Sequence, residues 1–257
     1  MSLLEINGLS KQFGGLKAVS DFSVTVNEGE IVGLIGPNGA GKTTVFNLIT
    51  GLVAPDSGAV VFRGKDVTGL APHVVAKEGI ARTFQNIRLF KNMSVLDNVR
   101  AAFHCRLGYS VLQAGLRRKA FLDAENDVEE RALELLAQFG LGDSADRLAA
   151  NLPYGSQRRL EMARALALGP KLLLLDEPAA GMNPNEIAAL VDLIRRIRDE
   201  FGVTVLLIEH QMGLVMRLCE RIVVMDFGQI IAEGLPGEIR TNPLVLEAYL
   251  GRGAAAS

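Results

Sequence analysis

A glycine-rich loop is the part of the sequence whose residue types and spacing point most directly to chemistry. It follows the apolar run 31–35, precedes a segment expected to be helical at 43–50, and fits the pattern G-x-x-x-x-G-K-[ST]. Glycines let backbone N–H groups turn around phosphate oxygens, and a helix N-terminus adds the positive end of its dipole. The sequence therefore predicts a phosphate-binding loop made of Gly36, Pro37, Asn38, Gly39, Ala40, Gly41, Lys42, Thr43 and Thr44.

Two adjacent carboxylates, Asp176 and Glu177, follow the apolar run 172–175. Alone, such a pair is most simply the acidic end of a strand. Beside a phosphate loop the two side chains can take different roles. Asp176 suits Mg²⁺ bound through its water shell, and Glu177 suits a general base that polarises an attacking water. In the same scheme Lys42 neutralises the β- and γ-phosphates, and the Thr43 hydroxyl reaches the Mg²⁺.

The elements that would hold these residues belong to an α/β fold. The runs 31–35, 171–176, 203–208 and 221–225 are apolar on both faces and alternate with helical segments, which predicts a parallel core sheet. The runs 4–6, 22–27 and 60–62 alternate with period two, which predicts an antiparallel β-subdomain. A helix is expected at 185–200, with Asn183 as its N-cap and Glu186 in its first turn.

A helical segment interrupts this α/β pattern. Between about residues 94 and 150 the strand signal disappears and helical spacing of apolar residues replaces it. We expect one domain over residues 1–250, with a catalytic core and β-subdomain at 1–90 and 165–250, a helical subdomain at 91–164, and a disordered tail at 251–257. The basic run 117–119 is interpreted as solvated surface, with contact to acidic lipid or to a partner as the alternative.

Composition excludes several classes of protein. The 27 basic and 29 acidic residues give a net charge of −2, which argues against a nucleic-acid partner. The longest apolar runs fall far short of the ~20 residues that cross a bilayer. The first residues carry no secretory signal pattern, so we expect a cytoplasmic protein. The only cysteines, Cys105 and Cys219, have no paired spacing and predict reduced thiols.

The order of these motifs resembles that of ATP-binding cassette (ABC) ATPases of membrane transporters, over nearly the whole chain. The residues that carry the resemblance are Phe13, the loop 36–43, Gln85, the segment 154–157, Asp176, Glu177 and His210. The resemblance implies an ABC-type P-loop fold with ATP and Mg²⁺. It further implies that Phe13 stacks on adenine, that Gln85 reaches Mg²⁺ and the attacking water, and that His210 holds the γ-phosphate. By residue type alone, Phe13 is more often a core side chain, and the alternative for His210 is a structural hydrogen-bonding role.

The cassette signature departs from the family pattern. The usual sequence is Leu-Ser-Gly-Gly-Gln, and Pro153 to Gln157 differs from it at three of five positions. The resemblance assigns phosphate contact to Tyr154, Gly155, Ser156 and Gln157. Tyr154 either replaces the missing serine donor or packs beside the helix that follows, and we favour packing because a phenol extends farther than a serine hydroxyl. Asn183 stands where the family usually has Asp, which its N-cap role equally explains.

The segments 81–90, 154–161, 180–186 and 242–251 resemble the ATP-binding subunit of high-affinity branched-chain amino-acid (Leu, Ile, Val) uptake systems. Urea, short-chain amide and lipopolysaccharide-export ATPases are close relatives, so the solute stays open. The resemblance implies a second ABC ATPase subunit, identical or paralogous, and integral membrane permease subunits. It also implies, indirectly, a solute-binding protein, and a location on the inner face of the cell membrane.

The sequence disfavours two other classes of function. A soluble cassette acting on DNA or ribosomes is disfavoured, because the chain has neither a very long coiled coil nor a second cassette. A nucleotide-binding regulator without turnover would lack a base, but Glu177 is present.

Overall fold

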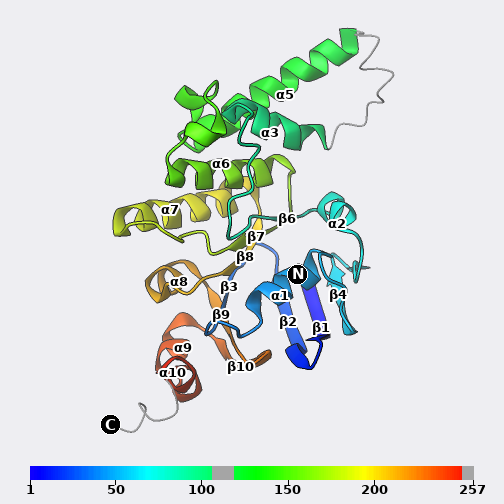
Figure 1. The fold of residues 1–257 in the computed structure, drawn as a ribbon, viewed down its shortest axis with the longest axis vertical. Helices are drawn as coiled ribbons and strands as arrows, with labels where there is room; N and C mark the ends of the chain where they lie inside the picture. Colours follow the sequence, from blue (N-terminus) through cyan, green and yellow to red (C-terminus); the bar gives the residue numbers. More distant parts are fainter. Residues whose placement is uncertain (106–118, 251–257) are drawn as a thin grey trace. The chain divides into compact units, whose positions relative to one another are not determined.

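The computed structural model of the chain describes residues 1–105 and 119–250 (Figure 1). Two compact units divide the chain, the first made of residues 1–85 and 171 onward and the second of residues 86–170. The tail expected to be disordered at 251–257 and the basic residues 117 and 118 lie outside the described residues.

A six-stranded sheet forms the centre of the first unit, in the order β10-β9-β3-β8-β7-β6. Its parallel strands are β9 (Arg221–Asp226), β3 (Ile31–Ile35), β8 (Thr204–Ile208), β7 (Leu172–Asp176) and β6 (Ile80–Arg82). The edge strand β10 (Gln229–Gly234) runs antiparallel to β9. The four predicted parallel strands are confirmed. Two edge strands were not predicted from the sequence. They are β6, which has only three residues, and β10, whose residues are mostly half-buried and lack a clear alternation.

An antiparallel sheet of four strands accompanies it, in the order β2-β1-β4-β5. Its members are β1 (Ser2–Phe13), β2 (Leu16–Asn27), β4 (Ser57–Phe62) and the short β5 (Lys65–Asp66). The predicted antiparallel strands are therefore confirmed, although β1 and β2 extend well beyond the predicted runs. The β1–β2 hairpin turns at residues 14–15, directly after Phe13.

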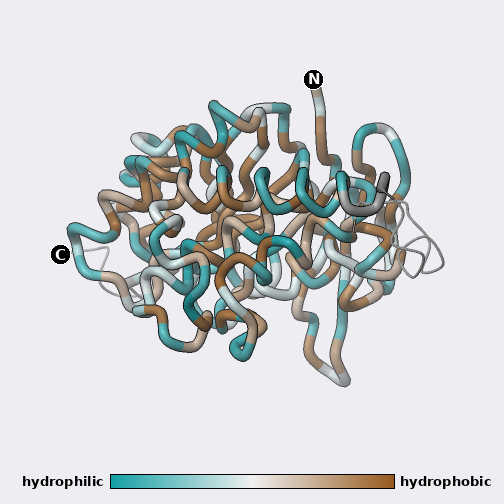
Figure 2. Tube along the Cα trace, turned by 90° about the horizontal axis from the view of Figure 1, so that it is seen from above, coloured by the Kyte–Doolittle hydropathy of each residue, from teal (hydrophilic) through white to brown (hydrophobic). Residues whose placement is uncertain are grey.

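Most of the core of the first unit lies between these two sheets, where α1 (Lys42–Ile49) also packs. One face of the six-stranded sheet contributes alternate residues of β3, β7, β8 and β9, among them Val32, Leu174 and Leu206. Figure 2 shows hydrophobic stretches of the trace in brown, interspersed along the chain with hydrophilic stretches in teal. The burial of α1 on this core fixes the end of the phosphate loop that precedes it.

The opposite face of β3 packs against α8 (Met212–Leu218). A Cβ atom at Gly33 would lie 2.9 Å from the Cys219 Sγ and 3.3 Å from a Val215 methyl, so β3 and the end of α8 approach too closely for any side chain here. Both cysteines are free, as the sequence predicted, and Cys219 is buried. The remaining helices of this unit are α2 (Pro72–Glu78), α7 (Pro184–Phe201), α9 (Pro236–Thr241) and α10 (Pro243–Leu250).

The start of α7 has the predicted cap. The Asn183 Oδ1 accepts hydrogen bonds from the N–H groups of Asn185 and Glu186, and a Glu186 carboxylate oxygen accepts the Asn183 N–H at 2.8 Å. This reciprocal arrangement satisfies donors that a helix N-terminus otherwise leaves unpaired. The N-cap interpretation of Asn183 is confirmed.

The second unit is helical in the part that the structure describes. It contains α3 (Val95–His104), α5 (Lys119–Gln138), short 3₁₀ helices at Gly142–Ser144 and Ala149–Asn151, and α6 (Tyr154–Ala167). Its buried residues include Val99 of α3, Ala132 and Leu136 of α5, and Leu160 of α6. The change from strand to helical spacing in the sequence therefore predicted the character of this unit.

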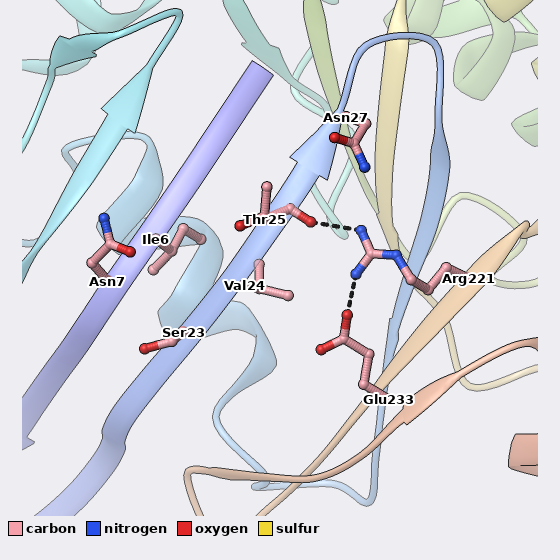
Figure 3. Close-up of a pocket in the computed structure, with 8 residues that line it drawn as sticks. All are labelled: Ile6, Asn7, Ser23, Val24, Thr25, Asn27, Arg221 and Glu233. Atoms are coloured by element: carbon pink, nitrogen blue, oxygen red, sulfur yellow. Dashed lines mark hydrogen bonds and ion pairs between the residues drawn. The ribbon is translucent and has the colours of Figure 1, made fainter. Parts of the chain in front are cut away.

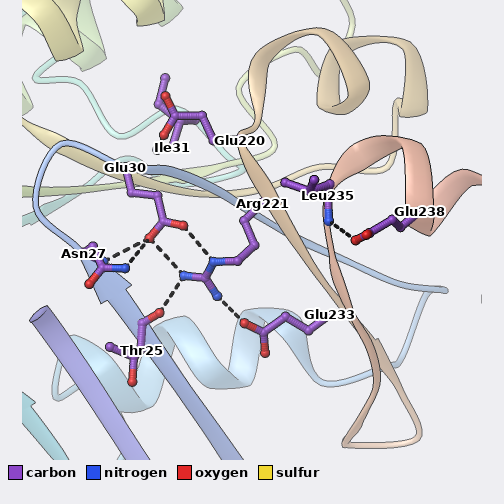
Figure 4. Close-up of polar contacts among 9 residues, drawn as sticks. All are labelled: Thr25, Asn27, Glu30, Ile31, Glu220, Arg221, Glu233, Leu235 and Glu238. Carbon is purple, nitrogen blue, oxygen red and sulfur yellow. Dashed lines mark hydrogen bonds and ion pairs between the residues drawn. The ribbon is translucent and has the colours of Figure 1, made fainter.

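Arg221 joins the two sheets of the first unit. Its guanidinium donates to both carboxylate oxygens of Glu30, at 2.7 and 2.9 Å, and to the Thr25 carbonyl of β2 at 2.6 Å. It also pairs with Glu233 of β10 (Figure 4). Figure 3 shows the contacts with Thr25 and Glu233 beside a pocket of about 420 Å³ lined by β1, β2, β9 and β10. The planar guanidinium, with donors on several sides, can hold these strands in one arrangement.

We predict that Arg221→Met, which keeps an aliphatic stem, lowers the free energy of unfolding by about 2 kcal/mol. The cost arises because the largely buried Glu30 carboxylate loses its charged donors. Urea denaturation measures the change. In a Glu30→Gln background the same substitution should cost clearly less, because no charge is left without a partner. An equal loss of unfolding free energy in both backgrounds would contradict the interpretation that Arg221 stabilises the fold by pairing with Glu30.

Acidification should weaken the ion pair between Arg221 and Glu30. Burial by itself raises the pKa of Glu30, but the hydrogen bonds from Arg221 and the Asn27 amide outweigh burial, and the pKa lies below its ordinary value of 4.5. Because the folded pKa is the lower one, this stabilisation is complete above the unfolded pKa and is lost as the pH falls through the folded pKa. Wild-type stability should thus decrease more steeply with acid than that of Arg221→Met, and parallel decreases would refute the assignment.

Candidate functional site

The phosphate loop lies between β3 and α1, as the sequence predicted, and its glycines are required by close contacts. Gly36 and Gly41 have φ values of 149° and 103°. A Cβ atom at Gly36 would lie 2.1 Å from the Met225 carbonyl oxygen, and one at Gly41 would lie 2.3 Å from the Ala18 carbonyl oxygen. The loop therefore presses against both β9 and β2, with no space for side chains at these two positions.

Lys42 is held at the start of α1 with 8% of its surface exposed. Its Nζ donates to the carbonyl oxygens of Gly36 at 2.7 Å and of Pro37 at 2.8 Å. Burial lowers the pKa of Lys42, and the nearby carboxylates of Glu177 and Asp176 partly oppose that shift. An anion bound in the loop would supply the negative charge that favours the protonated amine.

Asp176 at the end of β7 forms a buried ion pair with Arg82 at the end of β6. The Arg82 Nη2 donates to the Asp176 Oδ2 at 2.7 Å, with the two side chains 5% and 3% exposed. The Arg82 Nη1 donates to the Asn47 Oδ1 of α1 at 2.7 Å, and the guanidinium lies 5.4 Å from the centre of the Phe46 ring. Arg82 thus connects the carboxylate to the helix that follows the phosphate loop. This role of Arg82 was not predicted from the sequence, although Arg82 stands three residues before Gln85.

Glu177 follows in a conformation that non-glycine residues rarely adopt, with a φ of 47°. Its carboxylate Oε2 accepts a hydrogen bond from the Gln85 Nε2 at 2.8 Å and lies 3.8 Å from the His210 Nδ1. Three residues that the sequence placed in one site, from three separate loops, therefore meet around one carboxylate. Strained backbone at such a position is typical of functional sites.

A pocket of about 850 Å³ brings most of the candidate residues of the first unit together. Its lining includes Phe13, the loop residues from Asn38 to Thr44, Gln85 and Glu177. Phe13 is 47% exposed, so it is not a core side chain. Asp176 and His210 are not among the residues that line this pocket.

Glu209, immediately before His210, is a residue that the sequence analysis missed. It is fully buried, and its carboxylate accepts backbone N–H groups of Ala179 at 2.8 Å, His210 at 3.1 Å and Gln211 at 3.3 Å. Burial raises the pKa of Glu209, and these hydrogen bonds oppose the shift. The carboxylate ties the loop after Glu177 to the loop that carries His210. The signal in the sequence was an acidic residue directly after the apolar run 203–208.

The signature segment starts α6 in the second unit. The Tyr154 hydroxyl accepts a hydrogen bond from the Arg158 Nη2 at 3.2 Å, and its half-exposed ring lies 5.7 Å from that guanidinium. The Ser156 hydroxyl accepts from the Arg159 Nη2 at 3.0 Å, and the Gln157 Nε2 donates to the Leu152 carbonyl at 2.9 Å. The Tyr154 hydroxyl thus has a partner within its own helix.

Along the described ranges, none of the helices has both the length and the apolar character needed to cross a membrane. Those ranges also contain no group of three or more His, Cys, Asp or Glu side chains arranged to hold a metal ion.

Comparison with known proteins gives family matches over two parts of the chain. Residues 19–180 match the family described as ABC transporter. Residues 229–255 match the family described as branched-chain amino acid ATP-binding cassette transporter. The first match contains the phosphate loop, Gln85, Asp176 and Glu177.

Curated relatives align over nearly the full length. The high-affinity branched-chain amino acid transport ATP-binding proteins LivG of Salmonella typhimurium and BraF of Pseudomonas aeruginosa are each 47% identical over 249 residues, covering 97% of this chain and 98% of theirs. The lipopolysaccharide export system ATP-binding protein LptB of Escherichia coli is 38% identical, covering 98% of both chains.

Solved structures agree with the fold. MJ1267, an ATP-binding cassette of an ABC transporter in its ADP conformation, matches with a TM-score of 0.85 and 35% identity, over 98% of this chain and 100% of that one. A nucleotide-free ATP-binding cassette from an ABC transporter matches with the same TM-score and 34% identity, with the same coverage. The predicted ABC-type α/β fold is confirmed, and the chain belongs to the ABC transporter family as one of its ATP-binding cassette ATPases.

Proposed function

We propose that this chain binds ATP with Mg²⁺ in the 850 Å³ pocket and hydrolyses it with Glu177 as general base, to drive the uptake of branched-chain amino acids. The observation that carries the proposal is the convergence of the phosphate loop, Gln85 and Glu177 on one pocket. The solute rests on the names of LivG and BraF and on the match of residues 229–255. Greater identity to these proteins than to LptB favours amino-acid import over lipopolysaccharide export.

In this mechanism the loop residues 36–44 bind the triphosphate with backbone N–H groups, the Lys42 ammonium and the N-terminus of α1. Phe13 stacks on the adenine. Glu177 accepts a proton from the attacking water. The Gln85 amide, 2.8 Å from the Glu177 carboxylate, orients that water. His210, beside the same carboxylate, contacts the γ-phosphate.

The residues proposed for the metal fit its chemistry. The Thr43 hydroxyl, the Gln85 amide and the Asp176 carboxylate all offer oxygen, the ligand type that Mg²⁺ prefers. Both Asp176 and Glu177 act electrostatically on Lys42, so their charges lie near the end of the loop. When bound, Mg²⁺ would neutralise developing phosphate charge. Arg82 would hold the Asp176 side chain for that contact.

We further propose that two cassettes, this chain and an identical or paralogous one, complete each other's sites. Tyr154, Gly155, Ser156 and Gln157 of the partner would meet the γ-phosphate, with Gly155, Ser156 and the helix N-terminus as the donors. The 1–250 region would act as one ATPase domain, with the helical part at 91–164 as its subdomain. The pair would bind integral membrane permease subunits at the inner face of the cell membrane. Closure of the pair would drive these subunits, to which a solute-binding protein would deliver the solute.

Glu177→Gln should keep ATP affinity and nearly stop hydrolysis, because an amide cannot accept the proton. Loss of a general base typically slows a reaction by ~10²–10⁴, about 2.7–5.4 kcal/mol. Steady-state phosphate release and ATP calorimetry measure the two effects. Glu186→Gln, in the first turn of α7, is the control and should retain turnover. A Glu177→Gln enzyme with near-normal turnover would remove this residue from the mechanism.

Lys42→Met should lower ATP affinity at least tenfold, because only backbone donors then face the phosphates. Methionine keeps most of the buried stem, so the fold should persist by circular dichroism. Lys65→Met on β5, 58% exposed, is the matched control and should leave affinity unchanged. Equal affinities of wild type and Lys42→Met by calorimetry would overturn the proposed phosphate site.

Tyr154→Phe distinguishes the two explanations of the altered signature. The Tyr154 hydroxyl accepts a hydrogen bond from Arg158 of the same helix, which favours packing of the ring beside α6, so we expect loss of the hydroxyl to cost about 1 kcal/mol of stability and to leave turnover in the assembled dimer nearly unchanged. If the hydroxyl is the missing phosphate donor, turnover falls roughly tenfold or more with unchanged ATP affinity. That outcome would refute the packing account.

A further inference from the structure

Phe227 is an aromatic residue that neither the core nor the proposed mechanism uses. It is 88% exposed and lies in the turn between β9 and β10. Its side chain nevertheless lines the same 850 Å³ pocket as Phe13 and the phosphate loop. An aromatic ring left in water gains none of the stabilisation that burial gives such residues.

The backbone at this turn makes phenylalanine an unfavourable choice. Asp226 pairs with Gln229, so Phe227 and Gly228 form a two-residue hairpin loop. Both have positive φ values, 43° and 80°. Such turns favour Asn, Asp or Gly at the first position, and a bulky residue with positive φ is strained. Neither turn formation nor burial therefore explains a phenylalanine here.

The turn is attached to the nucleotide site on both sides. The Gly228 N–H donates to the Ala40 carbonyl of the phosphate loop at 3.0 Å, and the Gly228 carbonyl accepts the Ser20 N–H of β2 at 2.8 Å. A Cβ atom at Gly228 would lie 2.9 Å from the Ala18 carbonyl oxygen. These contacts hold the Phe227 backbone in a fixed place relative to the loop.

Phe13 and Phe227 reach the pocket from different hairpins. Phe13 ends β1 and is half-exposed, with the Lys11 ammonium 5.6 Å from its ring centre. Phe227 extends from the β9–β10 turn. With the triphosphate on the loop, the planar base is the part of a nucleotide that offers a π-face to aromatic rings.

We propose that Phe227 is a second aromatic contact for the base of the bound nucleotide, in addition to Phe13. The inference rests on the proposed nucleotide site. It explains why a strained, exposed position carries an aromatic ring, since residues that violate a local rule are most often found where they serve function.

The test compares ATP with inorganic tripolyphosphate, which has the same charge-bearing group and no base. Calorimetry on the full chain should give Phe227→Ala an ATP affinity roughly 5- to 100-fold weaker than wild type, the range expected for one base–aromatic stack, with unchanged tripolyphosphate affinity. Phe227→Tyr keeps the ring and should bind ATP like wild type.

Arg63→Ala is the matched control. Arg63 holds the same position of the β4–β5 turn, with a φ of 53° before Gly64 at 75°, and does not line the pocket. Arg63→Ala should change neither the affinity for ATP nor the affinity for tripolyphosphate. Phe227→Asn should lower ATP affinity without lowering the melting temperature, because Asn tolerates positive φ.

Equal ATP affinity of Phe227→Ala and wild type would overturn the proposal. So would equal losses for ATP and tripolyphosphate, which would indicate a distorted loop. Failure of the nucleotide site itself gives a different result, because the wild-type chain would then bind neither ligand.

Discussion

A loop can surround a triphosphate with backbone donors only where no side chain stands in the way, and the first unit is built around that constraint. Gly36 and Gly41 press against carbonyl oxygens of β9 and β2 at distances that exclude a Cβ atom. The β9–β10 turn adds a hydrogen bond from Gly228 to Ala40. The loop is thus supported by both sheets. Elsewhere on these sheets, Arg221 of β9 joins them through its contacts with Glu30 and the Thr25 carbonyl. The positions of Lys42 and the other loop side chains depend on these contacts with the two sheets.

Charges around the loop are arranged so that each buried group has partners. Arg82 pairs with Asp176, Lys42 donates to loop carbonyls, and Glu209 accepts backbone N–H groups. Glu177 contacts the neutral amide of Gln85 at hydrogen-bond distance. Ionised groups out of water require such partners. A carboxylate that contacts a neutral amide, with a nearby histidine, suits a residue that must accept a proton during the reaction.

The sequence predicted the parts of the site that follow from short, local rules. The phosphate loop, the acidic pair at the end of β7 and the Asn183 cap are each defined by spacing along the chain, and all three lie where expected. Arg82 and Glu209 were missed because their importance depends on partners far along the chain. Arg82 meets Asp176 94 residues away, and Glu209 meets Ala179 30 residues away. The edge strands β6 and β10 were missed for a similar reason, since pairing with β7 and β9 defines them more than composition does.

The proposed function requires that ATP hydrolysis by this chain drives the uptake of branched-chain amino acids. The most direct measurement reconstitutes the chain with its membrane subunits in vesicles, adds the solute-binding protein, and follows labelled leucine together with phosphate release. We expect leucine uptake that requires ATP, competition by isoleucine and valine, and hydrolysis that accelerates when the loaded binding protein is present. Hydrolysis that proceeds at the same rate with no leucine uptake, or uptake that continues without ATP, would contradict it.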